Sequence, residues 1–355
     1  MAINSNFWKN KNVFITGHTG FKGSWLSMWL EHMGAKVTGY SLKPESSSCL
    51  FHKSKIGDRI KSIYGNVLNY KKLFESIDQA KPEILFHLAA QPLVSIGYEK
   101  PAKTFNTNII GTVNVLEVLK YSESIKSVII VTSDKVYKNT NNLKGYNENN
   151  ILGGCDPYSS SKSCCELITE SYRKSFFLKK KIGLATARAG NVIGGGDYSK
   201  DRLIPDIIKS VRKRENLQIR DKDNIRPWQF VLEALCGYLV LAQSLYKNIE
   251  LSESWNFGPI PTDCKKVEWI LNKFKKRFDF KSSFLPKNKM YETKMLKLDI
   301  SKSKNKLNWQ PIMSINEAVN FTSEWYEKKF KGNDEYEISL EQIKSYKRIH
   351  GELCG

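Results

Sequence analysis

The sequence contains no apolar run approaching the roughly 18 residues that would predict a membrane-spanning helix. Its seven cysteines show no Cys-x-x-Cys spacing, and an odd number of unmatched cysteines argues against a disulfide framework or a zinc site. A strand-like segment begins as early as Asn12, which leaves no room for a signal peptide. We therefore expect a cytoplasmic protein with reduced thiols, no membrane association and no bound metal.

Acidic residues are scarce beside basic ones, 36 against 56, so the formal net charge is +20. Such an excess favours an anionic partner, which can be nucleic acid, a membrane surface or a phosphorylated small molecule. The basic residues are nevertheless spread along the chain in short groups, such as those at 179–181 and 275–277. Basic groups at helix ends also complement the helix dipole. We therefore expect no nucleic-acid partner.

The first half of the chain alternates apolar strands with helical stretches. A strand at 12–16 is followed by a glycine turn, a helix at 24–33 and a strand at 36–40. Further strands are predicted at 83–90, 127–132 and 182–189, and further helices at 69–80, 103–121 and 158–177. This alternation predicts an α/β fold with a doubly wound, Rossmann-like parallel sheet that is covered on both faces.

After Asn191 the alternation loosens, and a glycine cluster opens a segment of short helices, prolines and charges. The predicted helices lie at 203–214, 230–247, 265–277, 315–329 and 339–348. For 355 residues, two domains are the natural expectation. We predict a dinucleotide-binding domain at 1–193, with 227–258 returning to it, and a smaller mixed α/β C-terminal substrate domain at 194–226 and 259–355.

Two motifs carry the chemistry of the first half. Gly17, Gly20 and Gly23 form a GxxGxxG turn between a strand and a helix, where backbone amides bind a pyrophosphate. Tyr158 and Lys162 stand four residues apart, after a helix start at Asp156-Pro157, so they share one helical face. A nearby ammonium group lowers the pKa of a tyrosine, which makes the phenolate usable as a base.

These two motifs, in this order and spacing, resemble the extended branch of the short-chain dehydrogenase/reductase superfamily. The resemblance covers nearly the whole chain, and His87-Leu88-Ala89-Ala90-Gln91 and Asn108 match cofactor-side segments of that family. His87 itself is expected to be a structural histidine. The resemblance implies NAD as cofactor, held by Gly17, Thr19, Gly20, Phe21, Lys22, Gly23, Ser41, Asn66, Val67, Leu88, Ala89, Ala90, Asn108, Tyr158 and Lys162.

A third motif distinguishes the dehydratases of this branch from its epimerases. The strand at 127–132 leads into Thr132-Ser133-Asp134-Lys135, in which an acid and a candidate base follow the hydroxyl residues. Most dehydratases have Glu where Lys135 stands. Lysine there, with the segments 18–26, 189–197, 201–206 and 225–229, is similar to the CDP-glucose 4,6-dehydratase family.

The resemblance implies a cycle that is redox-neutral overall. Tyr158 takes the proton of the sugar 4-hydroxyl while Ser133 or Thr132 hydrogen-bonds that oxygen, and hydride leaves C4. Protonated Asp134 donates to the departing 6-hydroxyl, Lys135 removes the C5 proton, and hydride returns to C6. This role for Lys135 needs a neutral amine, which we expect to result from burial and from a neighbouring cation such as Lys162.

The substrate is expected to be a nucleotide-linked hexose, most specifically CDP-glucose. Family position assigns its diphosphate to Asn191 and Arg226, with Arg202 nearby, since the planar fork of arginine suits phosphate. Gln91 and Leu203 complete the predicted substrate-binding set.

Three departures from the family pattern affect the cofactor and the substrate. The second strand ends in Gly39-Tyr40-Ser41-Leu42-Lys43 without the carboxylate that often binds the ribose of NAD, so Ser41 and Lys43 leave NADP open. Asn66 replaces an aspartate beside the adenine. The segment 291–299 only partly matches one close to the substrate in relatives.

Three alternatives remain: a GDP- or UDP-sugar dehydratase, a sugar-nucleotide epimerase, which the pair Asp134-Lys135 disfavours, and a non-catalytic nucleotide- or RNA-binding protein. A non-catalytic protein of this kind normally lacks the catalytic tyrosine or lysine, and here both Tyr158 and Lys162 are present. Helices like those at 103–121 and 158–177 commonly form a four-helix contact in this family, so a homodimer or a dimer of dimers is expected.

Overall fold

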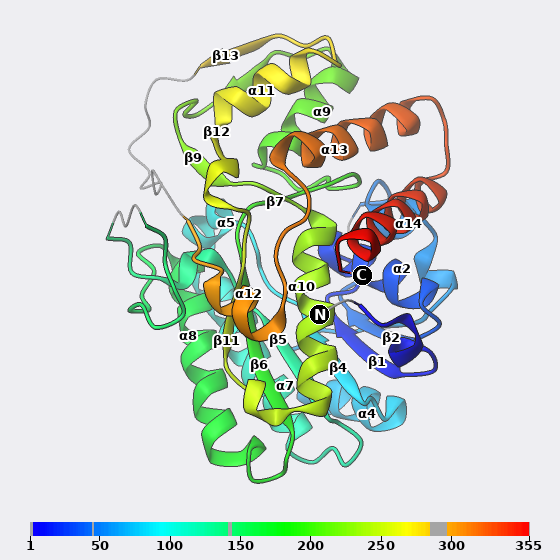
Figure 1. Ribbon diagram of the computed structural model, residues 1–355, viewed down its shortest axis with the longest axis vertical. Coiled ribbons are helices and arrows are strands. Elements are labelled where there is room, and N and C mark those ends of the chain that lie inside the picture. Colours follow the sequence, from blue (N-terminus) through cyan, green and yellow to red (C-terminus); the bar gives the residue numbers. More distant parts are fainter. Residues whose placement is uncertain (1–2, 45, 141–143, 285–296, 355) are drawn as a thin grey trace.

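The computed structural model describes residues 3–44, 46–140, 144–284 and 297–354. Its centre is a seven-stranded, wholly parallel sheet with the order β11-β6-β5-β4-β1-β2-β3 (Figure 1). The strands are β1 (Asn12–Thr16), β2 (Lys36–Ser41), β3 (Lys61–Tyr64), β4 (Ile84–His87), β5 (Ser127–Val131), β6 (Gly183–Ala189) and β11 (Ser254–Phe257). The predicted fold class is confirmed, and β3 is a strand that the sequence did not predict.

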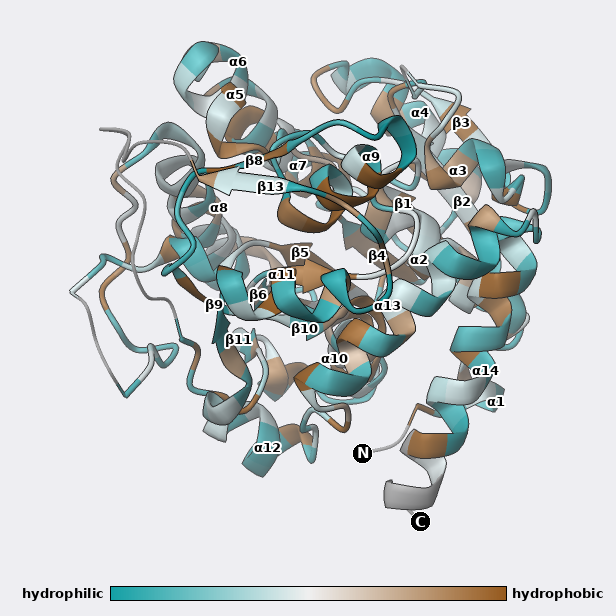
Figure 2. Ribbon diagram, turned by 90° about the horizontal axis from the view of Figure 1, so that it is seen from above, coloured by the Kyte–Doolittle hydropathy of each residue, from teal (hydrophilic) through white to brown (hydrophobic). Residues whose placement is uncertain are grey.

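Helices cover both faces of the sheet, because its central strands are buried on both sides. One face packs against α2 (Phe21–His32) and α10 (Val231–Lys247), and the other against α4 (Tyr70–Ala80) and α7 (Gly111–Leu119). Figure 2 shows the hydrophobic strands enclosed by helices whose outer sides are hydrophilic. The strand order reverses between β1 and β4, which in open α/β sheets opens a ligand site at the carboxyl ends of the strands.

The helix predicted at 103–121 is divided in the structure. It consists of α6 (Pro101–Phe105), a π-helical turn at Asn106–Ile110, and α7. A second π-helical turn, Arg173–Phe177, extends α8 (Pro157–Tyr172). Such turns insert one residue into a helix and occur often at functional sites.

The second region lies beyond the carboxyl ends of the sheet strands (Figure 1). It contains three two-stranded sheets, β7 (Val192–Ile193) with β10 (Gln229–Phe230), β9 (Ile225–Pro227) with β12 (Cys264–Lys266), and β8 (Leu217–Ile219) with β13 (Ser282–Phe284). The remaining α-helices are α1 (Ser5–Trp8), α3 (Leu50–Lys53), α5 (Val94–Glu99), α9 (Leu203–Lys213), α11 (Val267–Lys275), α12 (Ser301–Leu307), α13 (Ile315–Phe330) and α14 (Glu335–Cys354).

The last helix returns to the first region. Tyr346 of α14 makes an edge-to-face contact with Trp29 of α2, at a ring distance of 5.6 Å, and Tyr336 donates a hydrogen bond of 2.8 Å to Glu31. Helix α14 therefore packs on the first region, although it belongs by sequence to the second. The domain limits predicted from the sequence remain a proposal. Within the described ranges, no helix combines the length and the apolar character needed to cross a membrane.

Candidate active site

A cavity of about 1230 Å³ lies where the sheet meets the second region. Its wall combines the turn after β1 (17–23), the segment after β5 (131–135) and the segment after β6 (189–194) with residues of the second region. Pockets for one small ligand usually measure roughly 300–1,000 Å³. This cavity therefore has room for a cofactor and a substrate side by side.

The turn between β1 and α2 presents backbone amides to the cavity. Gly17 has a φ of +78°, and a Cβ there would lie 2.7 Å from the nitrogen of Ala89. A Cβ at Gly23 would lie 2.1 Å from the oxygen of Gly17, so neither position accepts a side chain. Gly20 caps α2 without a side-chain hydrogen bond. The first amides of this long helix are thus available to an anion, as a dinucleotide pyrophosphate requires.

Most of the predicted cofactor residues line this cavity: Gly17, Thr19, Gly20, Phe21, Lys22, Gly23, Ser41, Asn66, Val67, Leu88, Ala89, Ala90, Tyr158 and Lys162. Thr19 and Ser41 share a hydrogen bond of 2.8 Å between their hydroxyl oxygens. The Asn66 amide oxygen accepts a bond of 3.0 Å from the Leu68 nitrogen. The exposed Lys43 is absent from the wall. Together, these residues fit a dinucleotide.

Asn108 and Gln91 lie behind the wall rather than in it. The Asn108 amide accepts a bond of 2.8 Å from the Gln91 nitrogen and donates one of 2.8 Å to the Ser161 hydroxyl. Gln91 in turn donates a bond of 2.8 Å to Thr104. Both side chains are thus hydrogen-bonded to neighbouring residues, and they support the cavity wall from behind. Asn108 lies within the first π-helical turn.

His87 is structural, as expected from the sequence. Its two ring nitrogens lie 2.7 Å from the hydroxyl of Thr16 and 3.2 Å from that of Thr112. Burial lowers its pKa to about 3, so the ring stays neutral and fully hydrogen-bonded.

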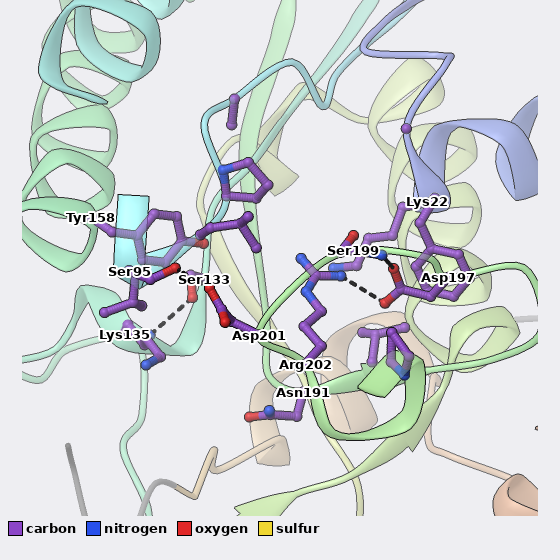
Figure 3. A pocket seen from close by; sticks show the side chains of 18 of the residues that line it. Lys22, Ser95, Ser133, Lys135, Tyr158, Asn191, Asp197, Ser199, Asp201 and Arg202 are labelled. Carbon is purple, nitrogen blue, oxygen red and sulfur yellow. Dashed lines mark hydrogen bonds and ion pairs between the residues drawn. The ribbon is translucent and has the colours of Figure 1, made fainter. Parts of the chain in front are cut away.

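The segment after β5 carries the predicted acid and hydroxyl groups. Ser133 caps a short 3₁₀ turn, in which its hydroxyl accepts a bond of 3.2 Å from the Lys135 nitrogen (Figure 3). The same hydroxyl donates a bond of 3.0 Å to Oδ1 of Asp134. The Asp134 side chain is buried, and its Oδ2 has no hydrogen-bond partner among the described residues. Burial raises its pKa against the opposing effect of Lys135. Burial therefore favours the protonated form of this acid.

Tyr158 faces the same segment from the start of α8. Pro157 opens this helix, and Asp156 caps it by accepting a bond of 3.0 Å from the Ser159 nitrogen. Burial raises the pKa of Tyr158 to about 12, although a hydrogen bond with Ser133 lowers it in part. Lys162 donates a bond of 3.0 Å to the Val131 carbonyl. The expected lowering of the Tyr158 pKa by Lys162 is thus wrong for this geometry, because burial outweighs every other effect.

Thr132 belongs to a buried ionic network. Its hydroxyl donates a bond of 2.5 Å to Glu166 of α8, and Glu166 also pairs with Arg188 of β6 at 2.7 Å. The side chains of this pair are 1% and 3% exposed. Burial alone would raise the pKa of Glu166, but Arg188 and the hydroxyl donors hold it below its ordinary value. Of the two hydroxyls left open by the sequence, that of Thr132 is committed to Glu166, whereas that of Ser133 bonds within its own turn at the cavity wall.

Lys135 lies in the cavity wall but is only half-buried. The amine of Lys162, its expected neighbour, is bound to a backbone carbonyl. The deep burial expected from the sequence is therefore not found at Lys135.

A second amine reaches this centre from the glycine turn. Lys22 donates a bond of 3.2 Å to the buried hydroxyl of Tyr238. Burial lowers its pKa to about 7, the cation of Arg202 acts in the same direction, and Asp134 opposes both. Figure 3 shows Lys22 directed into the cavity.

The predicted phosphate donors also belong to the cavity wall. Asn191, Arg202, Leu203 and Arg226 all line it. Arg202 is held by Asp197 at 2.9 Å (Figure 3), and Arg226 is close enough to Asp134 to lower the pKa of that acid. In the part of the chain that the structure describes, no group of three or more His, Cys, Asp or Glu side chains is arranged to hold a metal ion.

The family model for GDP-mannose 4,6-dehydratase matches residues 14–322. A CDP-glucose 4,6-dehydratase from Salmonella typhimurium is 46% identical over 352 residues, which cover 97% of this chain and 98% of that protein. The chain belongs to the sugar-nucleotide 4,6-dehydratase family.

Solved structures share the fold of this dehydratase family member. A UDP-glucose 4-epimerase from Thermotoga maritima gives a TM-score of 0.77 at 22% identity, covering 90% of this chain and 99% of that one. A dTDP-glucose 4,6-dehydratase from Bacillus anthracis, solved in complex with NAD, gives 0.74 at 23% identity and covers 92% and 98%. NAD is thus a cofactor within this fold.

Some site residues of this dehydratase family member escaped the sequence analysis. Ser95 donates a bond of 2.7 Å to Asp201 across the cavity, joining segments 106 residues apart (Figure 3). No local pattern signals such a contact. Arg188 did carry a signal, since a charge inside the apolar strand 182–189 requires a buried partner. The predicted substrate-proximal segment 291–299 falls, up to residue 296, outside the described residues.

Proposed function

We propose that the chain catalyses the NAD-dependent 4,6-dehydration of a nucleotide-linked hexose, with CDP-glucose as its substrate and CDP-4-keto-6-deoxyglucose as its product. The observation that carries this proposal is the segment Ser133-Asp134-Lys135, which lines the cavity together with Tyr158. Within it Asp134 is buried, and its Oδ2 has no hydrogen-bond partner among the described residues. An epimerase has no use for such an acid. The 46% identity to a CDP-glucose 4,6-dehydratase supports the choice of nucleotide.

Oxidation at C4 needs a base for the 4-hydroxyl. In this proposal Tyr158 takes that proton, Ser133 hydrogen-bonds the same oxygen, and Lys162 stays fixed to the Val131 carbonyl. NAD, when bound along the glycine turn, supplies the acceptor for hydride from C4, the donor of hydride to C6, and a positive charge that favours the phenolate.

The 4-ketone makes the C5 hydrogen acidic, which sets up the loss of the 6-hydroxyl. Asp134, whose pKa is raised by burial, is the proposed donor to the departing oxygen, so water leaves rather than hydroxide. Lys135 is the proposed base at C5, since it follows Asp134 directly and lines the cavity.

The substrate diphosphate is proposed to lie against Asn191, Arg202, the start of α9 at Leu203, and Arg226. The two guanidinium groups suit its paired oxygens. Gln91 would act indirectly, through the wall that it supports.

NAD rather than NADP is the proposed cofactor. Ser41 at the end of β2 lines the cavity and is bound to Thr19, whereas Lys43 does not reach the wall. The strand end thus brings no cation toward a 2′-phosphate. A dimer through α7 and α8 is also proposed, because helices of this kind commonly form a four-helix contact in the family; Leu167 on α8, which is 56% exposed, is available to such a contact.

A substrate panel tests the function. The purified chain with NAD should release a 4-keto-6-deoxy sugar from CDP-glucose, detected by the alkali-induced absorbance of the product, and should turn over GDP-mannose, UDP-glucose and dTDP-glucose far more slowly. A preference for one of those three substrates would support the proposed dehydration but contradict the choice of CDP as the nucleotide. No dehydration of any of them, together with tight and salt-dependent RNA binding, would refute the proposal.

The role of Lys135 has a separate test. Lys135→Met should slow release of tritium from C5-labelled substrate into water by about 10²-fold or more, because the base at C5 is lost. Oxidation at C4, followed as transient reduced cofactor, should still proceed. An unchanged rate of tritium release would remove Lys135 from this role; the neighbouring exposed Lys138→Met is the matched control.

A further inference from the structure

The Ser133 hydroxyl connects two groups that carry protons in the proposed reaction. It donates a hydrogen bond of 3.0 Å to Oδ1 of Asp134, and it lies close enough to the phenol of Tyr158 to lower the pKa of that group. Figure 3 shows Ser133 beside Tyr158 at the cavity wall. One hydroxyl therefore joins the base of the first step to the acid of the second.

The proton balance of the proposed reaction leaves these two groups unequal after each turnover. Tyr158 gains the proton of the 4-hydroxyl, and Asp134 loses one to the departing water. Lys135 takes one proton from C5 and, after exchange with water, gives one proton back to C5, while hydride leaves C4 and arrives at C6, so both of these transfers cancel. The enzyme thus ends each cycle with one proton too many on Tyr158 and one too few on Asp134.

We infer that Ser133 returns this proton directly: the Tyr158 O–H bond breaks as a new O–H bond forms at Ser133, and the original Ser133 proton moves to Asp134. The inference rests on the proposed function. It follows the hydrogen-bond direction of the structure, in which Ser133 already donates to Asp134. No oxidant, reductant or external acid is needed.

The surroundings of these groups favour an internal route over exchange with water. Asp134 is 3% exposed, Ser133 is 6% exposed and Tyr158 is 9% exposed. The other oxygen of Asp134 is buried without a hydrogen-bond partner among the described residues, so it offers no second path through the protein. Lys162, the cation on the same helix face as Tyr158, donates to the Val131 carbonyl.

The test compares the first turnover with later ones in Ser133→Ala. The first turnover should slow by only about tenfold, the effect of one lost hydrogen bond to the substrate. Later turnovers should slow by about 10²-fold or more, because the proton must then come from solvent. Rapid-quench analysis should therefore show a burst of about one product per site, and the slow phase should accelerate with imidazole buffer concentration.

Ser133→Thr keeps the hydroxyl and should show neither the burst nor the buffer effect. Equal slowing of first and later turnovers in Ser133→Ala, without acceleration by buffer, would overturn the relay and leave the dehydratase function standing; absence of wild-type turnover would instead refute the function. A measurement without turnover adds a check. The infrared band of protonated Asp134, identified by subtraction of Asp134→Asn, should shift in Ser133→Ala, and an unshifted band would also count against the relay.

Discussion

Replacing Tyr158 by phenylalanine should lower kcat for dehydration of CDP-glucose by about 10²- to 10⁴-fold, the range expected when a general base is removed. The ring of Tyr158 is buried at the start of α8, and the substitution removes only the hydroxyl, so folding should be retained. Binding of NAD, measured by calorimetry, should change little because the glycine turn is untouched. Steady-state product formation is the measurement.

The control for this variant is Tyr121→Phe, because Tyr121 is 63% exposed and lies outside the cavity wall. It should retain the wild-type kcat. A Tyr158→Phe enzyme that kept more than about a tenth of the wild-type rate would remove Tyr158 from the role of base.

The ionisation states required of Tyr158 and Asp134 explain why the loss should be large. Catalysis needs an ionised Tyr158 and a protonated Asp134, yet burial raises the pKa of Tyr158 to about 12 and raises that of Asp134 as well. Burial therefore protects the acid and opposes the base. In the wild type, kcat/KM should rise with pH as the phenol ionises and fall once Asp134 loses its proton, with apparent pKa values that belong to the coupled pair. Tyr158→Phe should lose the rising limb.

The sequence was sufficient to predict those parts of the site that depend on local spacing. The glycine turn, the shared helix face of Tyr158 and Lys162, and the run from Thr132 to Lys135 each follow from a strand end or a helix start. Parallel strands bring their carboxyl ends to one edge, so these segments met in one cavity as expected.

The remainder depends on contacts between distant segments. The commitment of Thr132 to Glu166 arises only when β5, α8 and β6 pack together, and the half-burial of Lys135 is a property of the assembled wall. The same holds for the pKa of Tyr158, whose direction was wrongly predicted because burial has no local signature. Strands of two or three residues, such as β7 and β8, are too short to show a periodicity.

The second large effect should come from Arg188→Met, which we expect to lower the free energy of unfolding by about 3–5 kcal/mol. Arg188 donates to Glu166 through Nε at 2.9 Å and through Nη2 at 2.7 Å, in a pair that is almost fully buried. Its removal leaves a carboxylate without a countercharge in the core. Urea unfolding followed by tryptophan fluorescence measures the loss, and Arg277→Met, at a half-exposed ion pair, is the matched control with an expected change of about 0–1 kcal/mol.

The double variant Glu166→Gln/Arg188→Met separates the charge from the packing. It should recover a substantial part of the stability lost in Arg188→Met, since no unpaired charge then stays buried. The pH dependence of the unfolding free energy should also report the charge of Glu166. The folded-state pKa of Glu166 lies below its ordinary value of 4.5, so the pair stabilises the wild type above that pH and ceases to do so as the pH falls through the lower, folded-state value. In Arg188→Met the buried carboxyl takes up a proton instead, so the stability difference between the two proteins should shrink on acidification. A difference that stays constant from neutral to acid pH would mean that Arg188 contributes through packing and not through its charge.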